Sequence, residues 1–383
     1  MPVTAKTLVV STEGLGENFG GGHSARVRPA VAKAARSCQL GLLLGLSLVP
    51  FGLSLGLGGC SFNLPARDVC GGAASCVVPD GGTVPPDMAV DPNEPGALGP
   101  YMQPYRSDLA VPMSLSLAGS KVRLYEPSED GVNLSTKQTT YPLILMAPSQ
   151  YLDVEQLAPY ATRLASHGFL VVVFKGQNES DQPAYRTSGL QLLNHLMQDA
   201  DPTLRDHIDK TKLGFWGYQL GAAISTSMAA QDSRISALML IDPVRVISLN
   251  EVPAINDIAS VQLQGGGRVL ILGEDASKAS YMGASACTPA GENYEAFFAK
   301  SKPNTISIAF PNAGISDFVQ AYPELCNRGS MSASDTQELA IKYTTAYFQW
   351  TLQPARVAAQ DYLLGAAFGK DAQRFMLNRQ IKM

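Results

Sequence analysis

From about residue 112 onward, short apolar runs alternate with longer segments of helical periodicity. The segment 121–126 alternates apolar and polar residues, as a half-buried strand does. Continuous apolar runs, typical of strands buried on both faces, follow at 142–147, 169–174, 212–216, 237–241, 268–272 and 306–310. Helices are predicted at 154–166, 188–198, 222–230 and 335–352. Strands that alternate with helices predict an α/β fold, a mostly parallel, doubly wound sheet with helices on both faces.

The most informative of these segments joins the strand 212–216 to the alanine-rich helix 222–230. The turn between them reads Gly217-Tyr218-Gln219-Leu220-Gly221. This is the layout of a nucleophile elbow, G-x-S-x-G, with Gln219 where the serine belongs. Glycines suit the flanking positions because a Cβ there would clash with the sharply turned backbone. A glutamine amide is not a nucleophile, so the turn predicts the scaffold of a hydrolase without its usual reagent.

The glycine spacing alone is a weak signal in a chain with 35 glycines. A glycine-bounded turn in another α/β fold would give the same pattern. The rest of the chain therefore has to decide between the two interpretations.

Residues 1–59 have the character of a targeting segment. A basic stretch leads into an apolar run at 39–59, which ends in Leu57-Gly58-Gly59-Cys60. This ending resembles a bacterial lipoprotein signal, in which cleavage precedes a cysteine that carries the lipid. A plain membrane anchor is the alternative. On the lipoprotein interpretation, Cys60 anchors the protein to a membrane of the bacterial cell envelope, and Ser61 after it favours the outer membrane.

Residues 60–110 are predicted to be a disordered tether rich in proline and glycine, which leaves 111–383 as the folded domain. Cys70 and Cys76 lie close together in the tether. In an oxidising compartment they are expected to form a small disulfide loop. Two thiols with no histidine nearby are too few for a metal site.

Composition narrows the functional classes. The 383 residues are 45% hydrophobic and 16% charged, enough to bury a large core, and carry a formal net charge of −4. No basic cluster predicts nucleic-acid binding. The glycines at 265–267 precede a strand instead of opening a helix, so they do not predict a phosphate-binding loop. No cofactor is expected.

Several ordered blocks resemble one family, the chlorophyllase and bacterial polyester-hydrolase branch of the α/β-hydrolase fold, which is dienelactone-hydrolase-like. The similarity extends over about 112–352. The blocks are Ala165-Ser166-His167-Gly168-Phe169, Ile241-Asp242-Pro243-Val244, Cys287-Thr288-Pro289 and Ala313-Gly314-Ile315-Ser316-Asp317-Phe318. Their agreement with the elbow favours an α/β hydrolase over the alternative fold.

The resemblance assigns three triad positions in the chain order serine, acid and histidine. The nucleophile position is Gln219, the acid position is Asp242, and the histidine position is Ile315. A different alignment would place the base at Asn312, which is no base either. The resemblance also implies an oxyanion hole made by the backbone N–H groups of Leu220 and Gln150.

Histidine usage supports this assignment without any alignment. The chain has four histidines, and all of them precede the elbow: His23, His167, His195 and His207. The loop after the last core strand therefore has no histidine to offer as a base.

The resulting prediction is an envelope lipoprotein whose hydrolase domain is catalytically inactive and acts by binding or scaffolding. A small ester or carboxylate is the expected ligand. The alternative is a carboxylic-ester hydrolase with a rearranged site, in which Ser149, Ser225 or Ser227 attacks with help from Asp242, a lysine or a glutamate. A purely structural envelope protein is a third interpretation.

One further expectation follows from the family blocks. Cys287 begins one of these blocks, Cys326 follows another, and the two flank the last core strand. In an oxidising compartment they are expected to form a disulfide that holds the loop after that strand.

Overall fold

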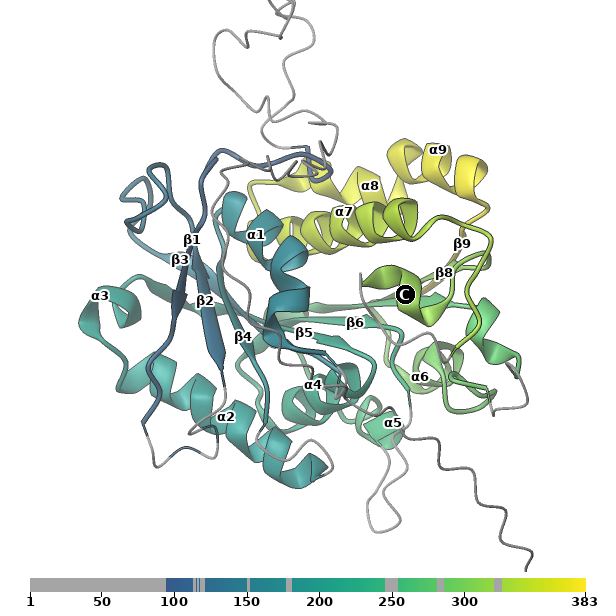
Figure 1. Ribbon diagram of the computed structural model, residues 1–383, viewed down its shortest axis with the longest axis horizontal. Coiled ribbons are helices and arrows are strands. Elements are labelled where there is room, and N and C mark those ends of the chain that lie inside the picture. Colours follow the sequence, from purple (N-terminus) through teal and green to yellow (C-terminus); the bar gives the residue numbers. More distant parts are fainter. Residues whose placement is uncertain are drawn as a thin grey trace, which may run out of the picture. The chain divides into compact units, whose positions relative to one another are not determined.

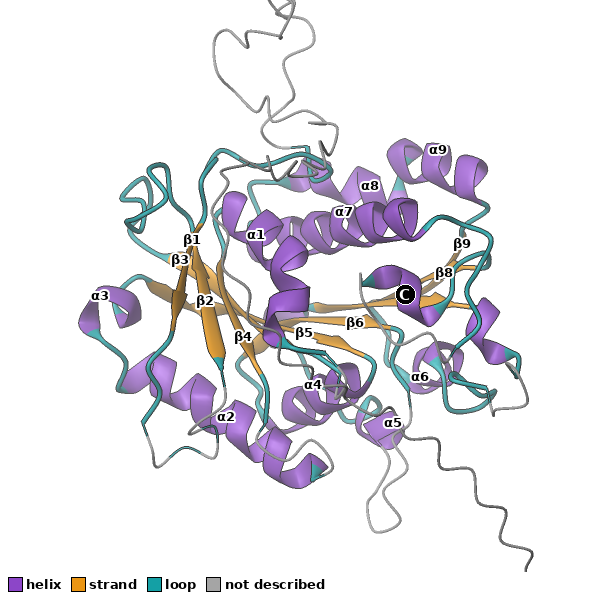
Figure 2. Cartoon of the chain, in the orientation of Figure 1, coloured by secondary structure: helices purple, strands orange, loops and turns teal. Residues whose placement is uncertain are grey.

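The computed structural model describes residues 94–112, 115, 117, 121–149, 152–176, 181–244, 254–280, 286–319 and 326–383. They contain a 9-stranded sheet with the order β1-β2-β4-β3-β5-β6-β7-β8-β9 (Figure 2). The strands are β1 (Tyr105–Asp108), β2 (Val122–Glu126), β3 (Tyr141–Ala147), β4 (Leu170–Phe174), β5 (Ile208–Tyr218), β6 (Ile235–Ile241), β7 (Arg268–Glu274), β8 (Thr305–Phe310) and β9 (Asn378–Lys382). Strands β3 to β8 pair in parallel, whereas β1, β2 and β9 pair antiparallel. The predicted α/β class is confirmed.

Helices cover both faces of the sheet (Figure 1). One face carries α1 (Ala158–Ser166), α7 (Ala333–Leu352), α8 (Asp361–Leu364) and α9 (Ala366–Phe375), and the other carries α2 (Gln182–Gln198), α4 (Leu220–Gln231) and α6 (Tyr294–Lys300). Shorter helices are α3 (Pro202–Arg205), α5 (Ala254–Asp257) and the 3-10 turns η2 (Val154–Leu157), η3 (Gln264–Gly266), η4 (Ala276–Lys278), η5 (Ile315–Phe318) and η6 (Val357–Gln360).

Two apolar cores fill the space between the sheet and the helices. Strand β3 supplies both, because successive side chains point to opposite faces: Ile144 and Met146 enter the core under α1 and α7, and Leu143 and Leu145 enter the core under α2 and α4. This explains why the strand is a continuous apolar run and does not alternate.

Helix α2 begins at Gln182, earlier than the apolar pattern indicates. The carboxylate of Asp181 accepts a hydrogen bond from the backbone N–H of Ala184 at 3.0 Å, and a proline occupies the first turn. Both features favour a helix start, and they extend the helix beyond its buried stripe.

Two stretches at the ends of the domain differ from the prediction. Residues 94–110, assigned to the tether, belong to the fold, because Tyr101 is buried and β1 pairs with β2. Residues 353–383 hold α8 and α9 and also the unpredicted strand β9, which pairs with β8. The predicted leader 1–59, Cys60, Cys70, Cys76 and Gln150 lie outside the described residues.

In the part of the chain that the structure describes, no helix combines the length and the apolar character needed to cross a bilayer.

The side chain of His167 links the segment around Ala97 to helix α7 by two hydrogen bonds. Its Nε2–H donates to the carbonyl of Ala97 at 2.9 Å, and its Nδ1 accepts from the side-chain amide of Gln349 at 2.9 Å. A neutral imidazole satisfies both contacts, since a carbonyl can only accept and an amide N–H can only donate. Burial lowers the pKa of His167 to about 4. The residue is therefore structural and uncharged at neutral pH.

We expect His167 to make unfolding pH-dependent in a defined window. Its pKa is about 4 in the folded state and 6.5 in its ordinary state, so the unfolded chain binds the extra proton between these values. The free energy of unfolding should rise between pH 4 and 6.5 by up to about 3 kcal/mol from this residue. Urea unfolding across that range should show the rise in the wild type and a smaller one in His167→Gln. Equal slopes in the two proteins would contradict the assignment.

Candidate active site

The turn at the end of β5 is an elbow whose two flanking positions, Gly217 and Gly221, have space only for glycine. A Cβ on Gly217 would lie 2.3 Å from the carbonyl oxygen of Gly221. A Cβ on Gly221 would lie 1.9 Å from the carbonyl oxygen of Ala147, at the end of β3. Both distances are below any contact that a real Cβ makes. The start of α4 is therefore pressed against the turn that follows β3.

Gln219 sits at the apex of the elbow in an unusual backbone conformation. Its φ and ψ are 50° and −111°. Its N–H donates to the carbonyl of Ile241 at 2.9 Å, and its own carbonyl accepts from Ala222 and Ala223 at 3.0 and 3.1 Å. The first amides of a helix have no acceptor within the helix. The N–H of Leu220, the first residue of α4, is one of these amides and lies at the positive end of the helix dipole.

Asp242 lies beside the elbow on the neighbouring strand. The register pairs Tyr218 with Ile241, so Gln219 and Asp242 are the next residues of two parallel strands. Asp242 also has a positive φ, 45°, and its N–H donates to the carbonyl of Leu272 at 2.7 Å. Its side chain is fully buried, and among the described residues neither carboxyl oxygen has a hydrogen-bond partner.

A second buried carboxyl, Glu274, ends the next strand, β7. It is fully buried, and its Oε2 accepts from the N–H of Ser277 at 2.8 Å while its Oε1 accepts from the hydroxyl of Thr288 at 3.0 Å. Burial raises its pKa to about 7. Burial also raises the pKa of Asp242 well above its ordinary value, and the Glu274 carboxylate raises it further. The backbone N–H of Glu274 lowers the pKa of Asp242 and offsets only part of this rise.

Glu274 was not predicted as a site residue from the sequence. The available signal was its place directly after the apolar strand 268–272, which is the same place that Asp242 has after 237–241. In a parallel sheet, residues at the carboxyl ends of neighbouring strands meet at one edge, where ligands bind in open α/β folds.

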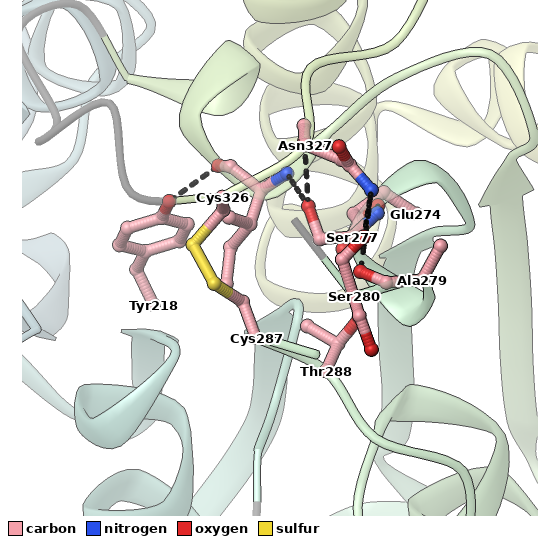
Figure 3. Close-up of a disulfide and its surroundings, with 10 residues drawn as sticks. Tyr218, Glu274, Ser277, Ala279, Ser280, Cys287, Thr288, Cys326 and Asn327 are labelled. Carbon is pink, nitrogen blue, oxygen red and sulfur yellow. Dashed lines mark hydrogen bonds between the residues drawn. A yellow bond between two sulfur atoms is a disulfide. The ribbon is translucent and has the colours of Figure 1, made fainter. Parts of the chain in front are cut away.

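Ile315, at the expected histidine position, packs into the apolar core and is 1% exposed. Its carbonyl accepts from the hydroxyl of Tyr218 at 2.5 Å, and its N–H donates to the Oγ of Ser277 at 3.0 Å (Figure 3). The Oγ of Ser277 in turn donates to the carbonyl of Asn327 at 2.9 Å. The loop after β8 therefore contributes an aliphatic side chain near the elbow, and hydrogen bonds to Tyr218 and Ser277 fix its backbone.

Cys287 and Cys326 form the disulfide expected from the sequence, with their Cα atoms 5.8 Å apart (Figure 3). It joins the segment after η4 to the segment after η5, so it closes the same loop that carries Ile315.

The three serines considered as alternative nucleophiles differ in their surroundings. Ser225 donates to the carbonyl of Trp216 at 3.1 Å, inside the fold. Ser227 donates to a carboxylate oxygen of Asp257 at 2.5 Å, two turns along α4 from the elbow. Ser149 is buried in the turn after β3, next to the elbow contact. Of the three, Ser149 alone belongs to the turn that the elbow touches.

A further buried hydroxyl, not predicted from the sequence, lies beside Ile315. Ser316 follows Ile315, and its buried Oγ has no hydrogen-bond partner among the described residues. No three His, Cys, Asp or Glu side chains group as metal ligands in the described ranges.

A hollow at the opposite edge of the sheet does not belong to this site. Its lining includes Lys212, Ser236 and Arg268, which lie at or near the amino ends of β5, β6 and β7. The candidate site is thus the elbow edge, where Gln219 and Asp242 have positive φ and where Asp242 and Glu274 are buried.

Comparison with known proteins agrees with this geometry. Residues 131–255, which include the elbow and Asp242, match the PET hydrolase-like family. Cutinase 1 of Thermobifida cellulosilytica and a cutinase of Thermobifida fusca (strain YX) are each 29% identical to the chain over 108 residues. Cutinase est1 of Thermobifida alba is 28% identical over the same length. These matches cover 28% of this chain and 41%, 36% and 36% of the three relatives, so the chain spans well under two thirds of each.

The expectation that the domain is no enzyme is corrected by this finding. It rested on the missing serine and histidine, yet the relatives that the chain matches bear the names of enzymes, cutinases. The substitution of the serine and the histidine removes the triad mechanism. It does not show that the site lacks every other mechanism of ester hydrolysis.

Removing the disulfide should destabilise the domain. The bridge closes a separation of 39 residues, and the loss of that constraint should lower the free energy of unfolding by about 3–4 kcal/mol. Denaturant unfolding of Cys287→Ser with Cys326→Ser, compared with the oxidised wild type, measures the difference. An unchanged midpoint would show that the contacts of Ile315 and Ser277 hold the loop without the bridge.

Proposed function

Because the matched part of the chain belongs to the polyester-hydrolase branch of the α/β hydrolases, we propose that the domain hydrolyses carboxylic esters with a rearranged active site. The site lies at the carboxyl ends of β5, β6 and β7. Gln219, Leu220 and Asp242 are its central residues. A water molecule takes the place of the serine hydroxyl as the attacking group.

The observation that carries this proposal is backbone strain at two neighbouring positions. Four described residues other than glycine have a positive φ, and two of them, Gln219 and Asp242, end adjacent strands. Such conformations cost about 1–3 kcal/mol each and cluster at active sites, where the surrounding structure enforces them. The packing of Gly221 against the end of β3 holds this conformation, so the elbow still presents its apex at the edge of the sheet.

The elbow supplies electrostatic stabilisation for ester hydrolysis. The N–H of Leu220, at the amino end of the 12-residue helix α4, is placed to donate to the oxygen that becomes negative when water attacks an ester carbonyl. Gln219 offers a second donor in its side-chain amide. Asp242, beside them on β6, is the group that exchanges protons with the attacking water and the leaving alcohol.

The names of the relatives indicate the substrate class. Cutinases and PET hydrolase-like proteins are named for polyesters, so the proposed substrate is an ester of a carboxylic acid within or derived from such a polymer. We extend this class to the chain on the strength of the shared domain region, 131–255.

We also propose that the domain is displayed in the bacterial cell envelope, on the outer membrane. The apolar run ending at Cys60 supports a lipid anchor, and the proline-rich stretch before residue 94 supports a spacer between the lipid and the fold. A surface enzyme tethered in this way meets polymeric esters that do not enter a cell.

The activity itself is testable with short-chain nitrophenyl esters. The wild-type domain should hydrolyse them, and Asp242→Asn should lower kcat by about 10²-fold or more, because a carboxamide cannot exchange the proton. Ser149→Ala should keep wild-type turnover. A fluorophosphonate, which reacts with nucleophilic serines, should neither inactivate the protein nor increase its mass.

Two results would count against this scheme in different ways. A covalent fluorophosphonate adduct on Ser149 or Ser316, with loss of turnover, would replace water by a serine nucleophile. A wild-type protein that hydrolyses no ester would contradict the proposed function as a whole.

The lipid anchor has its own test. Mass spectrometry of the mature protein from a bacterial membrane fraction should find an N-terminal Cys60 that carries lipid, and Cys60→Ser should release the protein from the membrane. An unmodified Cys60 inside a longer chain would contradict the anchor.

A further inference from the structure

Ser277 on η4 connects the end of β7 with the loop after β8 (Figure 3). Its side chain is fully buried. Its N–H donates to the Oε2 of Glu274 at 2.8 Å. Its Oγ donates to the carbonyl of Asn327 at 2.9 Å and accepts from the N–H of Ile315 at 3.0 Å. One serine thus contacts three segments that lie far apart in the sequence.

The carbonyl of Ser277 binds a fourth segment. It accepts from the N–H groups of Cys287 and Thr288 at 3.1 and 3.3 Å. The hydroxyl of Thr288 donates in turn to the Oε1 of Glu274 at 3.0 Å. Ser277 therefore supplies one donor to this carboxyl and holds the residue that supplies the other. Its contact with Cys287 also places it beside the disulfide to Cys326.

Ile315 extends this set of contacts to the elbow. Its N–H binds the Oγ of Ser277, and its carbonyl accepts from the hydroxyl of Tyr218 at 2.5 Å. Tyr218 directly precedes the apex residue, Gln219. Tyr218, Ile315 and Ser277 are all buried, where water does not compete for these hydrogen bonds. A single residue of the loop after β8 is thus held by hydroxyls from η4 and from β5.

We propose that Ser277 is a positioning residue of the proposed site, and that it acts through Ile315 and Tyr218. It holds the elbow, and with it the N–H of Leu220, in place relative to the carboxyl end of β7. Such placement matters because an oxyanion donor acts only at hydrogen-bond distance, and a misplacement of about 1 Å can cost about 10²-fold in rate. The catalytic part of this inference rests on the proposed ester hydrolysis. The connection between Ser277 and the elbow rests on the hydrogen bonds alone.

The turn η5 has further anchors that do not involve Ser277. The hydroxyl of Tyr160 on α1 donates to the carbonyl of Phe318 at 2.8 Å. The Oδ2 of Asp317 accepts from the N–H of Gly314 at 2.7 Å. These contacts and the disulfide hold the turn when the Ser277 hydroxyl is removed. A change at Ser277 therefore tests the position of the turn and not its existence.

Steady-state kinetics with a nitrophenyl ester test the role of Ser277. Ser277→Ala leaves the N–H of Ile315 without its partner and should lower kcat by about tenfold or more, with KM within about twofold of the wild-type value. Tyr218→Phe should act in the same way, because it frees the same residue from the other side. The double variant should lower kcat no further than the stronger single change. Ser188→Ala removes an equally buried hydroxyl on α2 and is the matched control, with wild-type kinetics.

Amide hydrogen exchange tests the connection without any turnover. The N–H of Gln219 donates to the carbonyl of Ile241, so its exchange reports on the elbow and not on the Ser277 hydroxyl. Ser277→Ala should accelerate this exchange by about fivefold or more, and Ser188→Ala should leave it unchanged. Tyr218→Phe should likewise accelerate exchange of the Ile315 N–H. This second variant carries the test if Ser277→Ala does not fold.

The outcomes separate the positioning role from the proposed function. Wild-type exchange at Gln219 in folded Ser277→Ala would overturn the connection. An active wild type whose kcat is unchanged in Ser277→Ala, or falls independently in the two single variants, would overturn the positioning role. A wild type that hydrolyses no ester but shows the accelerated exchange would overturn the proposed function and the catalytic part, and would support the connection between Ser277 and the elbow.

Discussion

The contact between Gly221 and the carbonyl oxygen of Ala147 is the constraint on which this edge of the sheet depends. It leaves no space for a side chain, so the amino end of α4 is held against the end of β3. That approach forces the sharp turn at Gln219 and fixes the direction of the first helix amides. The strain at Gln219 is therefore a consequence of backbone packing, and it does not depend on which side chain occupies the apex.

Burial also affects the chemistry of the site. The loop after β8 contributes Ile315, an aliphatic residue fixed by Tyr218, Ser277 and the nearby disulfide. Asp242 is fully buried and its carboxyl oxygens have no hydrogen-bond partner among the described residues, so a negative charge on it is not stabilised. The neutral carboxyl is then the favoured species, and a proton held inside the protein becomes available for exchange.

The elements that the sequence predicted well are those whose burial is evident from their local amino-acid composition. The apolar runs that became β3 to β8 are of this kind, and the glycines at 217 and 221 marked the elbow. Strand β9, with the sequence NRQIK, has no apolar run, since it is half exposed and exists because β8 offers an edge to pair with. The placement of Asp242 and Glu274 at the ends of neighbouring strands depends on strand order, which residue spacing does not encode. The predicted inactivity is contradicted by relatives that are named as cutinases; it rested on absent residues, which say nothing about those that tertiary structure brings together.

Strand β9 also protects the molecule against self-association. It covers the backbone of β8 along Thr305–Ala309, and its own five residues include Arg379, Gln380 and Lys382. A chain cut before Asn378 would present the apolar strand β8 as a bare sheet edge, open to pairing with another copy. Strand β9 thus helps to keep the protein soluble. A purification tag or a proteolytic cut there would cause aggregation before it affected the elbow.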